Sequence, residues 1–422
     1  MDAKIILNKK LSEIKPSLKE EEIITGFVSA FMPRLNKSLA KFNAKAVLGG
    51  SFSKGTTIKK DKYDVDIFVV FPKSAKDISH LLEKALKSLK IKAVRLPGSR
   101  DYFSIKVREY WAEFSMEIVP VVKIKKAEEA LNVTDVSVLH VSYVKKKIAQ
   151  SKKLSDEIRL AKAFCYAQGC YGAESHIRGF SGYCLEVLTA YYGSFINLAK
   201  ATSKWGDRVV IDPEKHYKNK DEVLLEINEA KLISPIVLVD PVQKNRNVAA
   251  ALDSAKFELF KKNCKAFVSS PAERFFERKR IDEEKIIINA TKKRYELFKV
   301  TAVSDKVKED ISGAKLLKLH NLLKISLEKG GYSVNAEWDF KGNKSSSYLT
   351  LTKSPTKLIR KGPQVKMEQH AKAFRKKWKK VSVKNGWLFA EDKPKTAETI
   401  LRLDKNILNE MSIDSYSVEE LA

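Results

Sequence analysis

The sequence lacks long apolar segments. None of its 422 residues lies in a run of about 18 apolar residues, the length that a membrane-spanning helix requires. The opening residues, MDAKIILNKK, also lack the apolar stretch and small-residue cleavage site of a signal peptide. We therefore expect a cytoplasmic protein without a membrane-spanning segment.

Cysteine is also scarce, and its few residues are not arranged for metal binding or disulfides. The sequence has no C-x-x-C motif and no histidine near them at the spacing of a zinc site. We expect reduced, mostly buried thiols, as is usual in the cytoplasm. The cysteines are Cys165, Cys170, Cys184 and Cys264.

Acidic residues are too few to balance the basic ones. Eighty Lys and Arg face 52 Asp and Glu, which gives a net charge of +28. This excess favours a polyanionic partner, because Lys and Arg neutralise nucleic-acid phosphates. The alternative is that the charge reflects genomic composition or a high-salt cytoplasm. The apolar content of 44% is that of a folded protein, and the length suggests roughly two to four domains.

One glycine-containing segment lacks the residue that a P-loop needs. Gly50 and Gly55 have the spacing of a Walker A motif. That motif requires Lys and then Ser or Thr directly after the second glycine, whereas Thr56 follows Gly55 at once. The lysine required for a P-loop is therefore missing.

The same segment continues into a predicted strand that carries two carboxylates. Residues 49–70 read GGSFSKGTTIKKDKYDVDIFVV. Because alternate residues of a strand share a face, Asp64 and Asp66 should project together. Adjacent carboxylates repel each other unless a cation lies between them, and Mg²⁺ prefers one or two carboxylates together with substrate phosphates. Taken alone, an Asp-x-Asp pair is more often part of a solvated strand face than of a metal site.

The glycine turn before this strand has the features of a phosphate site. Gly50 leaves backbone N–H groups open to approach, Ser51 supplies a hydroxyl donor, and Lys54 supplies a positive charge. A nucleoside triphosphate fits this arrangement. The spacing, with twelve residues between Ser51 and the Asp64 motif, resembles that of the DNA polymerase β nucleotidyltransferase superfamily.

A third carboxylate interrupts the apolar strand predicted over residues 114–122. Burying Glu117 there without a partner would be costly. Nucleotidyl transfer is helped by two Mg²⁺ ions, one activating the attacking hydroxyl and one holding the triphosphate and its leaving pyrophosphate. We predict that Glu117 completes a metal site with Asp64 and Asp66. The alternative is a surface glutamate on an edge strand.

Later segments resemble one family within this superfamily. Residues 171–188, with the core Arg-Gly-Phe-Ser-Gly-Tyr, and residues 239–250 resemble the central domain of the class I, archaeal-type CCA-adding enzymes, which are tRNA nucleotidyltransferases. Residues 362–364 and 385–387 extend the resemblance toward the C-terminus. The segments keep the family's order across nearly the whole chain.

This resemblance implies roles for individual residues. It implies metal ligands at Asp64, Asp66 and Glu117. It also implies contacts to the incoming CTP or ATP from Gly50, Ser51, Lys54, His140, Lys162, Tyr171 and Arg246. Arg246 would read the base edge, since its planar guanidinium can donate to acceptors on cytosine and adenine.

The resemblance further implies an activity. The protein would add CMP, CMP and AMP to the 3′ end of tRNA without a template, using CTP, ATP and two Mg²⁺ ions and binding the acceptor arm. One alternative is a poly(A) polymerase or oligoadenylate synthetase relative, which shares the catalytic head. Another is a catalytically inactive tRNA-binding protein. The sequence leaves open whether the chain forms a homodimer.

The expected fold is α+β and multidomain. We predict a polymerase β-like nucleotidyltransferase head with a mixed sheet over residues 1–133 and a helical central domain over residues 134–265. A small α+β RNA-binding body would follow over residues 266–361, and a basic tail over residues 362–422.

Hydrophobic periodicity predicts the main elements of these domains. Pro33 should kink or divide the first long helix. The predicted helices span residues 18–39, 77–89, 154–168 and 313–328; the strands span 104–107, 114–122 and 285–290; and a hairpin joins 333–339 to 346–351.

Basic residues cluster on a helix predicted over residues 370–380. Phe374 and Trp378 lie four residues apart and so share a face. Lysines beside an aromatic ring suit backbone phosphates, so we predict tRNA binding here; a plain solvated helix is the alternative. The lysines are Lys376, Lys377, Lys379 and Lys380.

Overall fold

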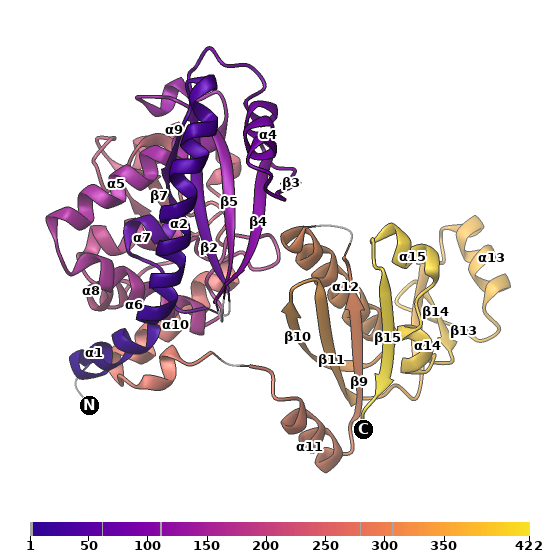
Figure 1. Cartoon of the computed structure of the whole chain (residues 1–422). Coiled ribbons are helices and arrows are strands. Elements are labelled where there is room, and N and C mark those ends of the chain that lie inside the picture. The colour runs from indigo at the N-terminus through magenta and orange to yellow at the C-terminus, as the bar shows by residue number, and fades with distance from the viewer. Residues whose placement is uncertain (1–2, 61, 110–111, 279, 306–307) are drawn as a thin grey trace. The chain divides into compact units, whose positions relative to one another are not determined.

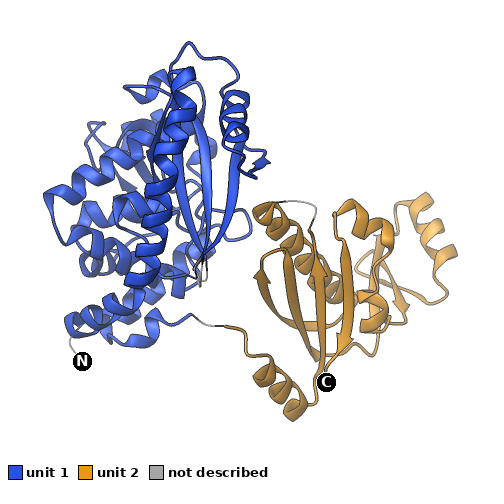
Figure 2. Cartoon of the chain, viewed as in Figure 1, with its two compact units in different colours: residues 1–279 blue, residues 280–422 orange. Residues whose placement is uncertain are grey.

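The computed structural model describes residues 3–60, 62–109, 112–278, 280–305 and 308–422. The chain divides into two compact units, residues 1–279 and 280–422 (Figure 1; Figure 2). Both units combine helices with strands, which confirms the predicted α+β multidomain class. The finer division into head, central domain, body and tail stays a prediction.

Unit 1 contains a mixed five-stranded sheet with two helices packed on it. Its strands are β1 (Lys45–Leu48), β2 (Tyr63–Phe71), β3 (Val94–Leu96), β4 (Tyr102–Glu109) and β5 (Ala112–Val122), and the helices are α2 (Leu18–Leu39) and α4 (Ile78–Ser88). The strand order is β1-β2-β5-β4-β3. Strands β2 and β5 run parallel, and the other neighbours run antiparallel. The strands and helices predicted for this region are confirmed.

The alternation of residues along β2 separates the core from the open face. Val65, Ile67 and Val69 are fully buried and belong to the hydrophobic cluster that includes residues of α2 and α4. Asp64 and Asp66 therefore project from the opposite face. A slip of one residue would exchange the two faces, so burial of the apolar set fixes the register of the carboxylates.

Helix α2 continues through Pro33, so the proline does not divide it. The helix begins at a capping box, in which the Ser17 hydroxyl accepts from the Glu20 N–H and the Glu20 carboxylate accepts from the Ser17 N–H. Phe31 and Leu35, on either side of Pro33, are buried in the sheet's core. This burial offsets the backbone hydrogen bond that proline cannot make.

The rest of unit 1 is mainly helical. Its elements are α1 (Ala3–Ile14), α3 (Gly50–Lys54), α5 (Ser137–Gln150), α6 (Leu154–Ala167), α7 (Gly182–Tyr192), α8 (Phe195–Thr202), α9 (Lys220–Glu226) and α10 (Ser254–Ser269), with the short strands β6 (Val209–Ile211), β7 (Ile236–Asp240) and β8 (Gln243–Asn247). These elements enclose a second core, centred on aromatic residues around Phe164. The four cysteines lie in this core, buried and free, as predicted.

Unit 2 contains two small sheets. Its elements are α11 (Glu283–Lys293), β9 (Glu296–Val303), α12 (Glu309–Lys329), β10 (Ser333–Lys341), β11 (Lys344–Lys353), β12 (Leu358–Gln364), α13 (Glu368–Lys377), β13 (Val381–Lys384), β14 (Trp387–Asp392), α14 (Ala397–Leu401), α15 (Lys405–Glu410) and β15 (Ser415–Glu420). The strand orders are β10-β11-β9-β15 and β12-β14-β13. The predicted β10–β11 hairpin and the helix over residues 313–328 are confirmed.

The strand predicted over residues 285–290 is wrong, because this segment lies within helix α11. Three consecutive isoleucines suggested a strand. However, Asp282 caps the helix by accepting from the Lys285 N–H, and Glu283 and Glu284 stand in the first turn, where acidic residues favour the helix dipole. The first strand of this sheet is β9 instead, and it precedes α12 and the hairpin.

Within the ranges described above, no helix combines the length and the apolar character needed to cross a membrane.

Candidate active site

The three predicted metal ligands meet on the open face of the unit 1 sheet. In the parallel pairing of β2 with β5, Asp66 lies opposite Glu117 and Asp64 lies opposite Ser115. The Ser115 hydroxyl donates to Asp64 Oδ1 at 2.7 Å. All three carboxylates line one cavity of about 430 Å³, the catalytic cavity. Two chain segments about fifty residues apart thus supply one acidic cluster.

The chemistry of this cluster suits a divalent cation. Burial, together with the charge of Asp64, raises the pKa of Asp66 to about 6. A cation bound between the two carboxylates would relieve their repulsion. All the donors are carboxylate oxygens, the ligand type that Mg²⁺ prefers. Across the described ranges, no three His, Cys, Asp or Glu side chains are already gathered closely enough to enclose a metal ion. The three carboxylates share the catalytic cavity with Ser51, Lys54 and Lys162.

Gly50 sets how closely the predicted phosphate site approaches the carboxylates. Its φ of +60° lies in the left-handed region that favours glycine. A Cβ here would lie 1.7 Å from Asp66 Oδ2, so any side chain would displace that carboxylate. The Gly49 N–H also donates to the backbone carbonyl of Asp66 at 2.8 Å. Ser51 follows at the start of α3 and lines the catalytic cavity, while its contact with phosphate stays a prediction.

Lys54 and Lys162 line the same cavity, but the structure shows them bound to a residue that the sequence prediction missed. Lys54 Nζ lies 2.6 Å from Glu186 Oε2, and Lys162 Nζ lies 2.7 Å from Glu186 Oε1. Thr56 completes this buried cluster by donating to Glu186 Oε1 at 2.9 Å. Glu186 stands alone among apolar residues of α7, and a carboxylate in such a place needs buried partners. That pattern was the available signal.

The buried cluster carries excess positive charge, because one carboxylate faces two ammonium groups. Burial alone would raise the pKa of Glu186, but the charges of Lys162 and Lys54 outweigh it and lower the pKa to about 2. Burial and the charge of Lys54 lower the pKa of Lys162 to about 8, despite the attraction of Glu186. The cluster is therefore an electropositive wall facing the carboxylates and able to attract phosphate.

His140 and Arg246, predicted to contact the nucleotide, converge on a second missed residue, Asp240. His140 Nε2 lies 2.8 Å from Asp240 Oδ2, and Arg246 Nη1 donates to the same oxygen at 2.6 Å. Asp240 is fully buried, whereas 43% of the Arg246 side chain is exposed. Burial alone would raise the pKa of Asp240, but its bond with His140 and the charge of Arg246 keep the pKa low. The anchored guanidinium thus keeps donors available to a ligand.

Tyr183 links this group to the catalytic cavity. Its hydroxyl donates to Asp240 Oδ1 at 3.2 Å, its ring lies 4.3 Å from that of His140, and it lines the catalytic cavity. We call Asp240, His140, Arg246 and Tyr183 the Asp240 cluster. An aspartate directly after the apolar run of β7 was the signal for this cluster, since a buried carboxylate must be paired.

Tyr171 also lines the catalytic cavity, and its contact with the nucleotide stays a prediction. Lys60 Nζ lies 5.0 Å from the centre of its ring, which is cation–π range. A Cβ on Gly182 would lie 2.9 Å from the Tyr171 hydroxyl, and one on Gly179 would lie 2.0 Å from the Cys170 carbonyl oxygen. The glycines of this segment therefore serve close packing, which seats the tyrosine at the cavity wall.

The predicted basic helix is α13, and the lysines at and just beyond its C-terminal end are exposed. The helix ends at Lys377, so its predicted extension to residue 380 is wrong; Trp378 follows in extended backbone, and its ring lies 6.2 Å from that of Phe374. Lys377 Nζ lies 5.5 Å from the Trp378 ring. The structure thus combines exposed charge and aromatic surface at Lys376, Lys377, Lys379 and Lys380. Their contact with tRNA stays a prediction.

Unit 1 matches two family models, and the chain resembles several solved structures. Residues 156–277 match the model for tRNA nucleotidyltransferase, second domain, and residues 1–138 match the second messenger oligonucleotide or dinucleotide synthetase domain. A cytoplasmic RNA terminal U-transferase aligns with a TM-score of 0.51 and 14% identity, over 66% of this chain and 99% of that one. Cid1, an RNA terminal uridylyl transferase, aligns with a TM-score of 0.53 and 13% identity, over 66% and 98%. At these identities the likeness shows the fold alone.

The sequence relatives are closer. The CCA-adding enzyme of Nanoarchaeum equitans is 36% identical over 337 residues, which cover 78% of this chain and 80% of that one. The CCA-adding enzyme of Methanocaldococcus jannaschii is 30% identical over 421 residues, 96% of this chain and 90% of that one. The polymerase β-like fold and these matches define the chain as a nucleotidyltransferase. Within that class, the chain belongs to the family of archaeal CCA-adding enzymes.

Proposed function

We propose that this chain builds and repairs the 3′-terminal CCA of cytoplasmic tRNA from CTP and ATP, without a template and with release of pyrophosphate. The observation that carries the proposal is the meeting of Asp64, Asp66 and Glu117 in one cavity opposite an electropositive wall. This is the charge arrangement that transfer of a nucleotidyl group to a hydroxyl requires.

The carboxylates are the groups that would hold two Mg²⁺ ions. Such ions, when bound, favour ionisation of the attacking tRNA 3′-hydroxyl and neutralise the triphosphate. Ser115 keeps Asp64 oriented through its hydrogen bond. Ser51 offers its hydroxyl to a phosphate oxygen. Lys54 and Lys162, held by Glu186, act mainly through their charge, since 8% and 2% of their side chains are exposed.

The Asp240 cluster is the proposed base-reading group. Asp240 restricts the orientation of the Arg246 side chain by accepting a hydrogen bond from Nη1. The other N–H groups of the guanidinium can then donate to a base edge. Cytosine O2 and N3 and adenine N1 are acceptors, so one oriented donor fork serves both CTP and ATP. His140 and Tyr183 then form the polar and aromatic surroundings of the base.

The test is extension of a tRNA that lacks its last three nucleotides, with products resolved at single-nucleotide length. CTP alone should add two residues, and ATP supplied afterwards should add a single further one. A long ladder with ATP alone would instead indicate a poly(A) polymerase. Tight tRNA binding without extension would indicate an inactive binding protein.

The α13 lysines give a prediction about tRNA affinity. The Lys376→Ala/Lys377→Ala variant should bind tRNA more weakly, because fewer counterions are released on binding. The slope of log K against log salt should fall by about 0.7 to 0.9 for each phosphate that the variant no longer neutralises. Binding isotherms at several salt concentrations measure this slope. The Lys376→Arg/Lys377→Arg variant keeps the charge and should keep the slope; an alanine variant with the wild-type slope would show that α13 does not contact tRNA.

A further inference from the structure

Unit 1 contains another cavity, lined in part by lysines, that the proposed chemistry does not use. It has a volume of about 440 Å³ and lies between the segment after β5 and helix α5. We call this cavity the basic hollow. It is lined by Lys125, Lys126, Glu128, Ser142, Tyr143 and Lys146, with Leu139 and Val242 at its apolar edge.

The lysines of the basic hollow are not neutralised by the protein. Lys125, Lys126 and Lys146 are exposed, and none of them forms an ion pair with a described residue. Glu128 is the one acidic residue among the described lining residues. The nearby Glu214 is already paired, because Lys147 Nζ lies 2.9 Å away and the Tyr143 hydroxyl donates to it at 2.7 Å. The Glu129 carboxylate also lies close by, since it accepts from the Lys125 N–H at 3.1 Å. Three lysines still outnumber Glu128 in the lining, so the hollow has excess positive charge that suits an anion.

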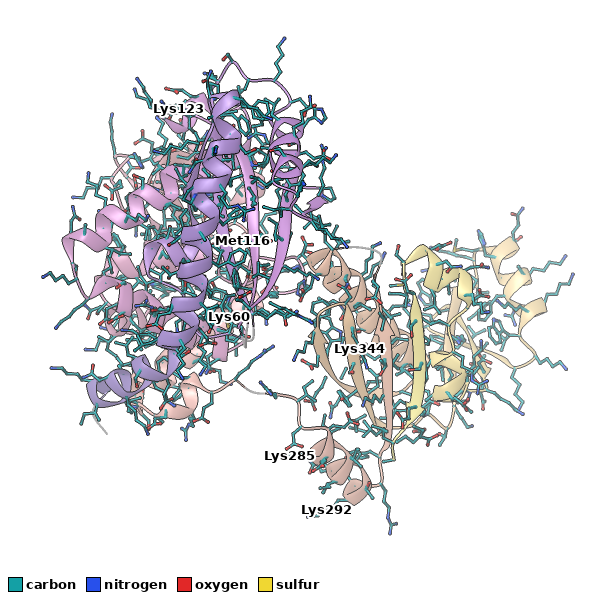
Figure 3. All side chains as sticks on the ribbon, in the orientation of Figure 1. Lys60, Met116, Lys123, Lys285, Lys292 and Lys344 are labelled. Carbon is teal, nitrogen blue, oxygen red and sulfur yellow. The ribbon has the colours of Figure 1, made fainter. Side chains whose placement is uncertain are left out.

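The triphosphate side of the catalytic cavity is too distant to supply that anion. Glu117 lies five residues before the end of β5, on the order of 17 Å at the rise of a strand, and the lysines of the hollow come after that end. Figure 3 shows Lys123, just beyond β5, at the opposite end of the sheet from Lys60, which lines the catalytic cavity. A phosphate in the hollow thus belongs to a different part of the bound substrates.

The hollow nevertheless adjoins the base-reading group. Leu139 and Ser142 flank His140 on α5. The N–H of Val242 donates to Asp240 Oδ1 at 3.0 Å, and Val242 lines the hollow. The hollow and the Asp240 cluster are thus joined through Val242 and through neighbouring residues of α5. A polymer whose end reaches the catalytic cavity past this cluster would bring its backbone to the hollow.

We propose that the basic hollow binds a backbone phosphate of the RNA acceptor, a few nucleotides before its reacting 3′ end. This inference rests on the proposed function. Three lysines match the charge of a phosphodiester and its neighbours. Ser142 adds a hydroxyl donor, and the Tyr143 ring, fixed by the bond of its hydroxyl to Glu214, provides a wall for the adjoining ribose. The hollow positions the RNA strand and takes no part in the chemical step.

The test compares two triple variants of the full chain. Lys125→Ala/Lys126→Ala/Lys146→Ala removes the three positive charges that line the hollow. Its matched control, Lys37→Ala/Lys84→Ala/Lys92→Ala, removes three exposed lysines near α2 and α4, away from both cavities. The probes are fluorescent tRNA lacking its last three nucleotides, for binding, and the same tRNA with CTP, for turnover.

We expect the hollow variant to raise the Kd and KM for tRNA about tenfold over the control variant at moderate salt. Its salt slope should fall by about 0.7 to 0.9 for each phosphate left without a lysine partner. The KM for CTP and the kcat at saturating tRNA should stay within about twofold of wild type. A rise in the KM for CTP without a change in tRNA binding would overturn the proposal, because the hollow would then serve the free nucleotide.

The failure of this inference is distinguishable from failure of the proposed function. Wild-type protein that extends tRNA, with equal Kd values for the two variants, overturns the phosphate site and leaves CCA addition standing. Wild-type protein that does not extend tRNA overturns the proposed function. In that case the binding titration alone decides: a selective loss of RNA affinity in the hollow variant supports the site, and equal affinities overturn it.

Discussion

Replacing Asp66 with asparagine is expected to lower kcat for nucleotide addition at least ~10³-fold, a change of about 4 kcal/mol in activation free energy. The amide keeps the shape of the side chain but removes a charged oxygen from the cluster that lines the catalytic cavity. The Kd for tRNA should stay within about twofold, because Asp66 is mostly shielded by the cavity and removing it leaves the basic surface intact. Single-turnover extension of tRNA with CTP measures the chemical step.

The matched control for this variant is Glu109→Gln at the end of β4, where the carboxylate is exposed and does not line the catalytic cavity. It should extend tRNA at the wild-type rate. If Asp66→Asn also retained turnover within tenfold of wild type, the assignment of Asp66 as a metal ligand would be wrong.

Replacing Glu186 with glutamine is expected to lower the free energy of unfolding of unit 1 by about 3 kcal/mol, because the change leaves two buried lysines without a counter-charge. Lys162, whose pKa is already lowered to about 8, can lose its proton and so limits the cost. The expected fall in Tm is roughly 6 to 12 °C for a unit of this size. Calorimetry on the full chain measures it.

A second variant separates stability from activity. Glu186→Gln/Lys162→Met removes one of the two unpaired charges and should recover at least half of the lost stability, yet it should remain impaired in CTP use. The Glu186→Gln variant should also lack one part of the acid destabilisation that the wild-type fold shows. Since the pKa of Glu186 is lowered from 4.5 to about 2, its carboxylate stabilises the fold above pH 4.5 and ceases to do so as the pH falls toward 2. Equal acid unfolding of both proteins would contradict the assigned pairing.

The acidic half of the catalytic cavity was predictable from sequence because it depends on local periodicity. Alternation along one strand places Asp64 and Asp66 together, and the apolar residues between them hold that register. The proximity of Glu117 follows once its strand is placed beside β2. The parallel register that sets it opposite Asp66 depends on packing across the sheet, which the pattern of a single strand does not specify.

The partners of the basic residues were not predictable in the same way. Lys54 and Glu186 are far apart in the chain and meet only through the tertiary fold, where Lys54 at the end of α3 reaches Glu186 on α7, so sequence spacing carries no sign of their contact. Asp240 was likewise hidden within a motif that was noticed for its resemblance and not for its charge. The strand prediction for residues 285–290 failed for another reason. Three isoleucines favour a strand, but helix capping and the charges at the helix ends outweigh that propensity.

The path of the first helix limits how the catalytic unit can move. Leu7 and Ile14 of α1 pack in the helical core, whereas α2 packs in the core of the sheet, so the chain crosses between the two cores at residues 15–17. It crosses back after β5, between residues 123 and 136. The Lys59 N–H donates to the Ile14 carbonyl at 2.7 Å and Lys15 pairs with Asp156, which fastens the first crossing. The turn between β1 and β2 fastens the two cores a third time, because Ile58 packs in the helical core and Lys54 and Thr56 bind Glu186 of α7. The cavity between the two cores is therefore braced on several sides, and its carboxylate and lysine walls are held facing each other before any substrate arrives.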